Sequence, residues 1–161
     1  DNGRSRGLGD VYKRQITNLI DKFSGQVSGE SIIEKNQVEI KEIFEQENIE
    51  EILKKTYSLS QNGSEFSKNT EHELKGKSPT SLKITFKQIH MATEMSLRDA
   101  LIMEYRMVQR CQASGDFYEG VRAMLVDKDR NPQWKPSNLD KVDEIWVNHF
   151  FEPLHEKDLK I

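Results

Sequence analysis

The sequence predicts an all-α chain, and three of its features carry that prediction. Apolar residues recur at three- and four-residue spacing from Ile16 onward, which is typical of helices with one buried face. Several segments open with a serine, asparagine or aspartate three residues ahead of an acidic residue, the pattern of a capped helix start. No segment alternates apolar and polar residues as a half-buried strand does. We therefore expect about six or seven helices.

The first fifteen residues differ from everything after them. They hold three glycines and four basic residues, with little periodic apolar content. We expect a disordered tail over residues 1–15, with foreign sequence as the alternative interpretation. After it we expect a helical segment over residues 16–77 and a C-terminal helical part over residues 78–161.

Two capped helices are expected within residues 16–77. Ser28 can cap the first, whose apolar residues start at Ile32. Asn48, followed by Glu51, can cap the second, and the turn-forming sequence SQNG then ends it. A more polar third helix follows that turn.

The C-terminal part begins with two well-bounded helices. Ser78 can cap a helix whose first residue is Pro79, where the N–H that proline lacks would have no helical partner. The next helix runs from its capping residue, Ser96, to Gly115, a residue that commonly follows a helix end.

Two further helix starts lie closer to the C-terminus. Asp116 and Glu119 form a capping pair for a short helix, and Ser137 with Asp140 opens the last helix. Between these helices, two prolines bracket a tryptophan in residues 132–136. We expect this loop to turn the chain back across the core.

Composition limits the classes of partner. A net charge of -3 argues against affinity for nucleic acid, which needs a basic face. No apolar run approaches the length of a membrane span, so we expect no membrane partner. Hydrophobic residues make up only 35% of the chain and charged residues 32%, with a mean hydropathy of -0.77. Such values are typical of helices that cover another surface.

One segment matches the start of a calcium-binding loop. Asp127, Asp129 and Asn131 stand at the first three ligand positions of an EF-hand. However, Pro132 stands where that loop needs glycine, and Asn138 where it needs a bidentate glutamate. The favoured interpretation is an acidic helix end that runs into a turn, and no metal site is expected.

No set of side chains in the sequence forms a recognisable active site. Cys111 lies on the apolar face of a helix, which favours a buried thiol over a nucleophile. As the one cysteine of the chain it cannot form an internal disulfide, which favours a reducing compartment. The histidines lack partners at zinc-site spacing; they are His72, His90, His149 and His155.

Aromatic residues gather toward the C-terminal end of the chain. They are Phe117, Trp134, Trp146, Phe150 and Phe151. One interpretation is that they anchor the last helices onto a core. The other is that the segment from Phe117 to Lys135 edges a ligand pocket, in which Lys128 or Lys135 reaches a phosphate.

Three blocks of the sequence resemble one known family. They are SPTSLKITFKQI, LRDALIMEYRMVQRC and DFYEGVRAMLVDKDRNPQWKP. In this order and spacing they are similar to the C-terminal region of the 3-hydroxyisobutyryl-CoA hydrolase family, within the crotonase (enoyl-CoA hydratase/isomerase) superfamily. The resemblance is strong from Ser78 to Pro136, loose from Ile16 to Lys77, and absent before Ile16.

The resemblance implies a fold class and one binding residue. It implies that the chain is the helical C-terminal part of a crotonase-type α/β spiral, whose N-terminal core of β-β-α turns is missing. That core supplies the oxyanion hole and the acidic groups of the family, so no catalytic residue is carried onto this chain. Lys128 matches a position at which the family places a basic residue near the nucleotide end of coenzyme A.

The resemblance also implies an activity. It is hydrolysis of the thioester of 3-hydroxyisobutyryl-CoA, in valine breakdown in mitochondria, with the chain alone inactive. The partner is then an acyl-CoA substrate bound through the full-length protein, and no cofactor is expected because CoA is part of the substrate. Two alternatives stay open: a free-standing helical interaction module, and another crotonase activity such as enoyl-CoA hydration.

Overall fold

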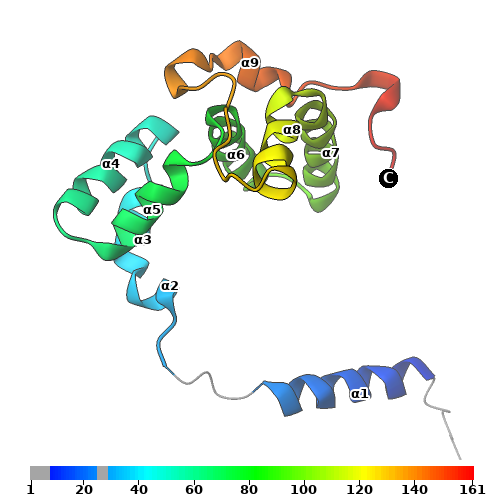
Figure 1. The fold of residues 1–161 in the computed structure, drawn as a ribbon. Helices are drawn as coiled ribbons and strands as arrows, with labels where there is room; N and C mark the ends of the chain where they lie inside the picture. The colour runs from blue at the N-terminus through cyan, green and yellow to red at the C-terminus, as the bar shows by residue number, and fades with distance from the viewer. Residues whose placement is uncertain (1–7, 25–28) are drawn as a thin grey trace, which may run out of the picture. The chain divides into compact units, whose positions relative to one another are not determined.

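The structure is a computed structural model that describes residues 8–24 and 29–161. It divides into two compact units, Asp1–Gln37 and Val38–Ile161, which are described separately (Figure 1). The first unit contains α1 (Leu8–Phe23) and α2 (Ile32–Lys35).

Helix α1 begins at Leu8, inside the segment for which the sequence predicts a disordered tail. Tyr12, Ile16 and Leu19 follow one another at helical spacing, and this stripe extends the periodic pattern back into residues 8–15. Those residues are therefore helical, whereas residues 1–7 lie outside the described ranges.

Helix α2 is capped by Ser31 rather than by Ser28, which lies outside the described residues. The Ser31 hydroxyl accepts the Glu34 N–H at 3.1 Å, and the Glu34 carboxylate accepts the Ser31 N–H at 2.8 Å. This reciprocal pair satisfies two N–H groups that the first helical turn leaves without partners.

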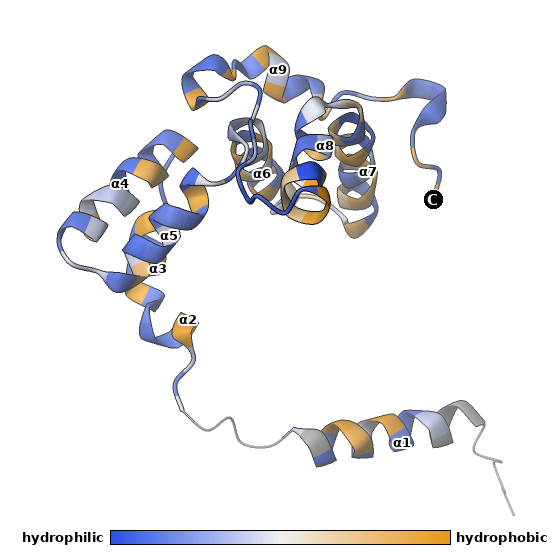
Figure 2. Cartoon of the chain, viewed as in Figure 1, coloured by the Kyte–Doolittle hydropathy of each residue, from blue (hydrophilic) through white to orange (hydrophobic). Residues whose placement is uncertain are grey.

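The second unit consists of helices joined by turns and by one longer loop over residues 127–138, and its first helix starts one residue before the unit, at Gln37. In chain order they are α3 (Gln37–Phe44), α4 (Ile49–Gln61), α5 (Glu65–Lys75), α6 (Pro79–Ala92), α7 (Leu97–Ala113), α8 (Gly115–Val121), the π-helical η1 (Arg122–Val126), the 3-10 turn η2 (Leu139–Lys141), α9 (Glu144–His149) and the 3-10 turn η3 (His155–Lys157). Figure 2 shows hydrophobic and hydrophilic residues alternating along α4, α6 and α7, as expected for helices with one buried face.

Three predicted helix starts are confirmed by their hydrogen bonds. The side chain of Asn48 accepts the Glu51 N–H at 2.9 Å. Ser78 and Ser96 cap α6 and α7 in the same way, each accepting an N–H at 3.1 Å. These caps are local interactions, so the sequence alone identifies them.

Two predicted starts are wrong. The last helix begins at Glu144 with Asp143 as its cap, not at Ser137, because the buried Val142 adopts an extended backbone that interrupts the helix. The short helix α8 follows Ser114 and has no side-chain cap. The carboxylate of Asp116 is engaged elsewhere, as described below.

Two apolar clusters hold the second unit together. The first lies among α6, α7 and α9 and contains Ile84, Met103, Met107, Val142, Val147 and Phe150. The second joins α3 and α4, with partly buried apolar side chains of α5 and α6 around it, and contains Ile43, Ile49 and Ile52. Serine hydroxyls also tie α3, α4 and α5 together: the buried Ser60 donates to Glu71, and the half-buried Ser64 and the buried Ser67 both donate to Glu39.

The expected fold class needs a correction. The sequence resemblance assigned these helices to an α/β spiral, but residues 8–24 and 29–161 contain no strand. The described chain is therefore all-α, and α/β is the wrong class for it. Within the same ranges, none of the helices has the length and apolar content needed to cross a bilayer.

Candidate functional site

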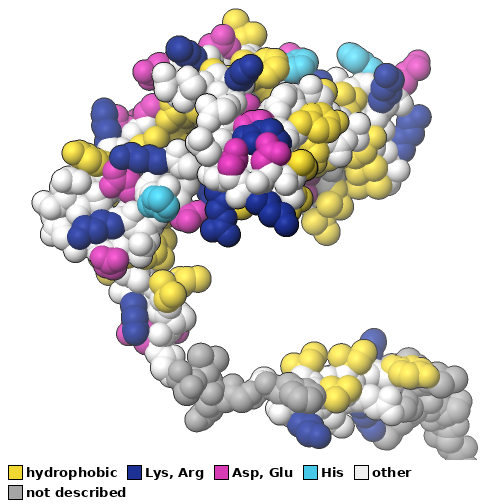
Figure 3. All heavy atoms as spheres, in the orientation of Figure 1, with side chains coloured by type: hydrophobic (Ala, Val, Ile, Leu, Met, Phe, Trp, Pro, Cys, Tyr) yellow, Lys and Arg dark blue, Asp and Glu magenta, His cyan; other side chains and the backbone are white. Residues whose placement is uncertain are grey.

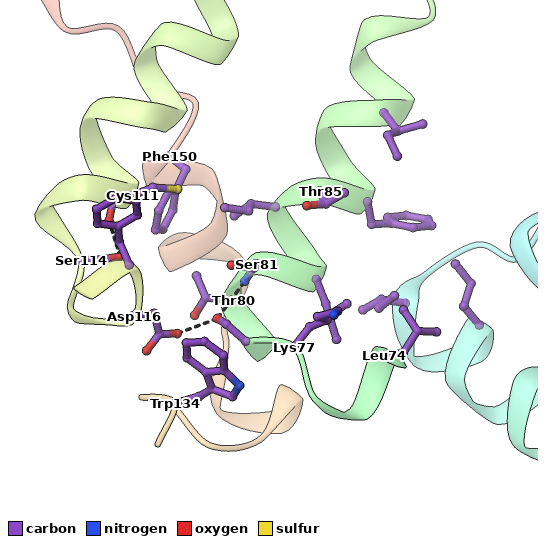
Figure 4. A pocket seen from close by; sticks show the side chains of 18 of the residues that line it. Leu74, Lys77, Thr80, Ser81, Thr85, Cys111, Ser114, Asp116, Trp134 and Phe150 are labelled. Atoms are coloured by element: carbon purple, nitrogen blue, oxygen red, sulfur yellow. Dashed lines mark hydrogen bonds between the residues drawn. The ribbon is translucent and has the colours of Figure 1, made fainter. Parts of the chain in front are cut away.

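A groove of about 600 Å³ runs along the second unit (Figure 4). Side chains of α3 to α8 line it together with Trp134 and with Phe150, which follows α9, and most of these side chains are apolar. The apolar lining residues are Phe44, Ile49, Ile52, Leu74, Leu82, Ile84, Phe86, Ile89, Cys111, Phe117, Trp134 and Phe150. A groove of this size and lining suits an apolar chain or a small amphipathic ligand.

One end of the groove is polar. The Ser78 hydroxyl donates to Asp116 Oδ2 at 2.6 Å (Figure 4). Asp116 Oδ1 accepts the backbone N–H of Lys135 at 2.9 Å. Asp116 therefore joins the start of α6 to the loop after η1, which explains why it does not cap α8. The hydroxyl of Thr80 lines the same end; it is buried without a hydrogen-bond partner in the described structure.

Trp134 closes the groove from the proline-bracketed loop. Its Nε1 donates to the carbonyl of Gly76 at 3.0 Å. Its ring lies so near Gly120 that a Cβ there would stand 3.3 Å from the ring, so only glycine fits without displacing the tryptophan. Phe117 and Trp134 thus edge a pocket, as one of the two sequence interpretations proposes.

The predicted phosphate contacts lie outside this groove. Lys128 is exposed, has a positive φ of 58°, and is not among the groove-lining residues. Lys135 lines a neighbouring hollow of about 420 Å³ together with Tyr118, Glu119 and Arg122. The structure therefore brings Lys135, but not Lys128, next to Asp116, and the role of Lys128 stays a prediction.

Arg122 binds one acidic residue of α8 and two that follow η1. Its Nε and Nη2 donate to the Glu119 carboxylate at 2.9 and 2.7 Å. Its Nη1 donates to Asp127 at 2.6 Å and to Asp129 at 2.8 Å, and Nη2 also reaches the carbonyl of Asn131 at 3.3 Å. Figure 3 shows this mixture of basic and acidic side chains over α8 and η1.

These contacts account for the residues that match a calcium loop. Asp127 and Asp129 both bind the guanidinium, and no group of three or more potential metal-ligating side chains occurs in the described ranges. Arg122 is not among the site residues predicted from the sequence. The Glu119–Arg122 spacing, which places both side chains on one helix face, was the available signal.

Glu119 has the most strongly shifted carboxyl pKa at this site. The Arg122 guanidinium and the N–H of Gln133, at 2.6 Å, lower the pKa of Glu119 from its ordinary 4.5 to about 2. The carboxylates in turn raise the pKa of Arg122, with Glu119 as the largest cause. Hydrogen bonds to the ionised form explain both directions.

We expect acid to remove the stabilisation that Glu119 provides. Because its pKa is lower in the folded chain, its contribution is complete above about pH 4.5 and is lost as the pH falls toward about 2. Glu119→Gln should therefore be less stable than the wild type near neutral pH, and the gap should close in that window. Urea unfolding across pH measures it. Glu94→Gln, at an exposed site, is the matched control, and a gap independent of pH would contradict the assignment.

Cys111, the thiol considered as a nucleophile, has no histidine hydrogen-bonded to it among the described residues. Burial raises the pKa of the Cys111 thiol, which keeps it protonated at the groove wall. His149 Nδ1 lies 3.0 Å from Glu152, and His90 Nδ1 lies 2.9 Å from the carbonyl of Phe86. Among the described residues, no hydrogen bond joins a histidine to Cys111 or to a serine hydroxyl, so this chain shows no assembled nucleophile.

Comparison with solved structures places these helices in a known fold. A carnitinyl-CoA dehydratase from Mycobacterium thermoresistibile superposes with a TM-score of 0.76 at 23% identity, over 93% of this chain and 44% of that protein. An enoyl-CoA hydratase from Rhodobacter sphaeroides gives 0.76 at 25% identity, over 95% of this chain and 45% of that one.

Curated proteins show a closer sequence similarity. The chain is 39% identical over 153 residues to a protein of Gallus gallus named mitochondrial 3-hydroxyisobutyryl-CoA hydrolase, covering 92% of this chain and 39% of that protein. The Homo sapiens protein of the same name is 41% identical over 129 residues, covering 80% of the chain and 33% of that protein. The chain thus spans well under half of the length of the relatives it matches.

The family comparison covers most of the chain. The family described as enoyl-CoA hydratase/isomerase matches residues 5–151, which include part of the first fifteen residues that the sequence resemblance excluded. The match extends from within the first residues through α1, the groove residues, and Arg122 with the carboxylates that it binds, to the end of α9. On this evidence, the chain belongs to the enoyl-CoA hydratase/isomerase family.

Proposed function

We propose that this chain is the C-terminal part of a mitochondrial enzyme that hydrolyses the thioester of 3-hydroxyisobutyryl-CoA in valine breakdown. The observation that carries the proposal is the similarity, at 39% identity over 92% of the chain, to a hydrolase of that name. The relatives are named mitochondrial, which supports the compartment.

The described residues fit a substrate-binding role rather than a chemical one. The groove offers an apolar surface with a polar end at Ser78, Thr80 and Asp116, which suits part of an acyl-CoA. Lys128 is proposed to approach a phosphate of the CoA nucleotide. The groups that activate water and stabilise the oxyanion then come from the part of the protein outside this chain, and CoA is substrate rather than cofactor.

Thioesterase assays test both parts of this proposal. We expect no turnover of 3-hydroxyisobutyryl-CoA by the 161-residue chain, because no nucleophile is assembled in its described part. The full-length protein should hydrolyse it, with free CoA detected through its thiol. Clear turnover by the chain alone would refute the binding-only role. A full-length protein that hydrates an enoyl-CoA but leaves this thioester intact would refute the hydrolase assignment.

The proposed part of an enzyme and the alternative, a free-standing interaction module, differ in how much apolar surface the isolated chain should expose. Many apolar side chains of the second unit are more than 40% exposed, including Ile89, Leu97, Val108 and Leu125. Figure 3 shows hydrophobic side chains gathered on the surface that α7 forms. If they pack against the rest of an enzyme, the isolated chain should bind a hydrophobic dye strongly and the full-length protein should not.

A further inference from the structure

Arg122 binds the carboxylates on both sides of Lys128. Asp127 and Asp129 are the sequence neighbours of Lys128, and Asp129 also precedes Arg130. Each carboxylate is close enough in the chain to pair with one of these cations. Both are instead held by Nη1 of Arg122, at 2.6 and 2.8 Å. Among the described residues, neither Lys128 nor Arg130 takes part in an ion pair, and both are exposed.

Two backbone bonds hold this loop without the Arg122 side chain, which itself contacts the loop backbone at one point, the carbonyl of Asn131, 3.3 Å from Nη2. In the π-helical turn η1, the Asp127 N–H donates to the carbonyl of Arg122 at 2.8 Å. The carbonyl of Ala123 is therefore free to accept the N–H of Arg130 at 3.0 Å. Lys128 and Arg130 have positive φ values of 58° and 54°. Removing the guanidinium should thus alter the local charges and leave these backbone bonds in place.

We propose that Arg122 is a positioning residue for phosphate recognition by Lys128 and Arg130. By holding Asp127 and Asp129, it keeps the two cations unpaired and available to a phosphate of the CoA nucleotide. The inference rests on the proposed function in one respect, that the ligand is an acyl-CoA. Without Arg122, the freed carboxylates would pair with Lys128 and Arg130 and would repel an approaching phosphate.

The binding of adenosine 3′,5′-bisphosphate, the nucleotide end of CoA, tests this role in the 161-residue chain. Arg122→Gln should weaken binding by roughly five- to tenfold at low salt, since two freed carboxylates oppose the phosphates across an exposed surface. Adenosine, which lacks the phosphates, should bind both proteins equally. Arg98→Gln is the matched control, because it removes the same charge from an exposed site on α7.

A charge rescue separates positioning from a structural role. Adding Asp127→Asn and Asp129→Asn to the Arg122→Gln variant removes the carboxylates that Arg122 restrains. Affinity should then return to within about twofold of the wild type, because the cations are again unpaired. The Asp127→Asn/Asp129→Asn double variant is the reference for this comparison: if Arg122 acts by holding the two carboxylates, adding Arg122→Gln to that variant should leave its affinity unchanged, whereas a role in loop stability would weaken binding there by the same factor as in the wild type.

Each outcome of these binding measurements either supports or overturns the positioning role of Arg122. The inference is overturned if Arg122→Gln binds the bisphosphate as tightly as the wild type, if the triple variant is no better than the single one, or if the wild type does not prefer the bisphosphate to adenosine. The proposed function is judged separately by thioester hydrolysis in the full-length protein. Arg122-dependent binding of the bisphosphate, without thioester hydrolysis by the full-length protein, would refute the proposed function and still support the positioning role of Arg122.

Discussion

Phe150→Ala should destabilise the second unit by about 3–5 kcal/mol. Phe150 is 1% exposed and is the largest fully buried side chain of the described chain. It packs in the cluster formed by α6, α7 and α9, and its ring meets that of Trp146 edge-on at 5.3 Å between centroids. Truncation removes this apolar contact and leaves a cavity that its neighbours can fill only partly. Urea unfolding followed by circular dichroism measures the loss.

Ile145 offers the matched control for this substitution. Ile145 lies on α9 with Val147, which packs in the same cluster as Phe150. The side chain of Ile145, however, is 82% exposed. Ile145→Ala should change the free energy of unfolding by no more than about 0.5 kcal/mol. Equal losses for the two alanine variants would show that the cluster does not hold α9 in place.

The sequence identifies those helix starts that depend on local interactions alone. Asn48, Ser78 and Ser96 each bond an N–H three residues later, so the pattern and the structure agree. The last helix fails this rule. Its predicted cap, Ser137, is followed by residues that pack Val142 into the core, and that tertiary contact favours an extended backbone.

The candidate site was harder to predict because it, too, depends on contacts between residues that lie far apart in the sequence. The groove is assembled from six helices, α3 to α8, and from the segments that carry Trp134 and Phe150, so no single segment carries its pattern. The bond from Ser78 to Asp116 joins residues 38 positions apart, and that from Trp134 to Gly76 joins residues 58 apart. The sequence leaves open whether Phe117 and Trp134 anchor the last helices or edge a ligand pocket. The structure places both beside the groove, and ligand binding there stays a prediction.

Ile43→Ala should destabilise the α3–α5 part of the second unit by about 2–5 kcal/mol. Ile43 is 0% exposed and packs with Ile49 and Ile52, in a cluster separate from that of Phe150. Val38→Ala on the same helix is the matched control. Val38 is 83% exposed and alanine has the higher helix propensity, so that variant should be neutral or slightly more stable.

The two buried substitutions together report how the second unit unfolds. If α3–α9 form one cooperative structure, Ile43→Ala and Phe150→Ala should lower the same transition, and their losses should add because the clusters share no buried residue. Native-state hydrogen exchange would then show both variants raising exchange in α4 and α7 alike. If Ile43→Ala raised exchange only in α3–α5, those helices would form a separately unfolding part, and the groove between the clusters would open without global unfolding.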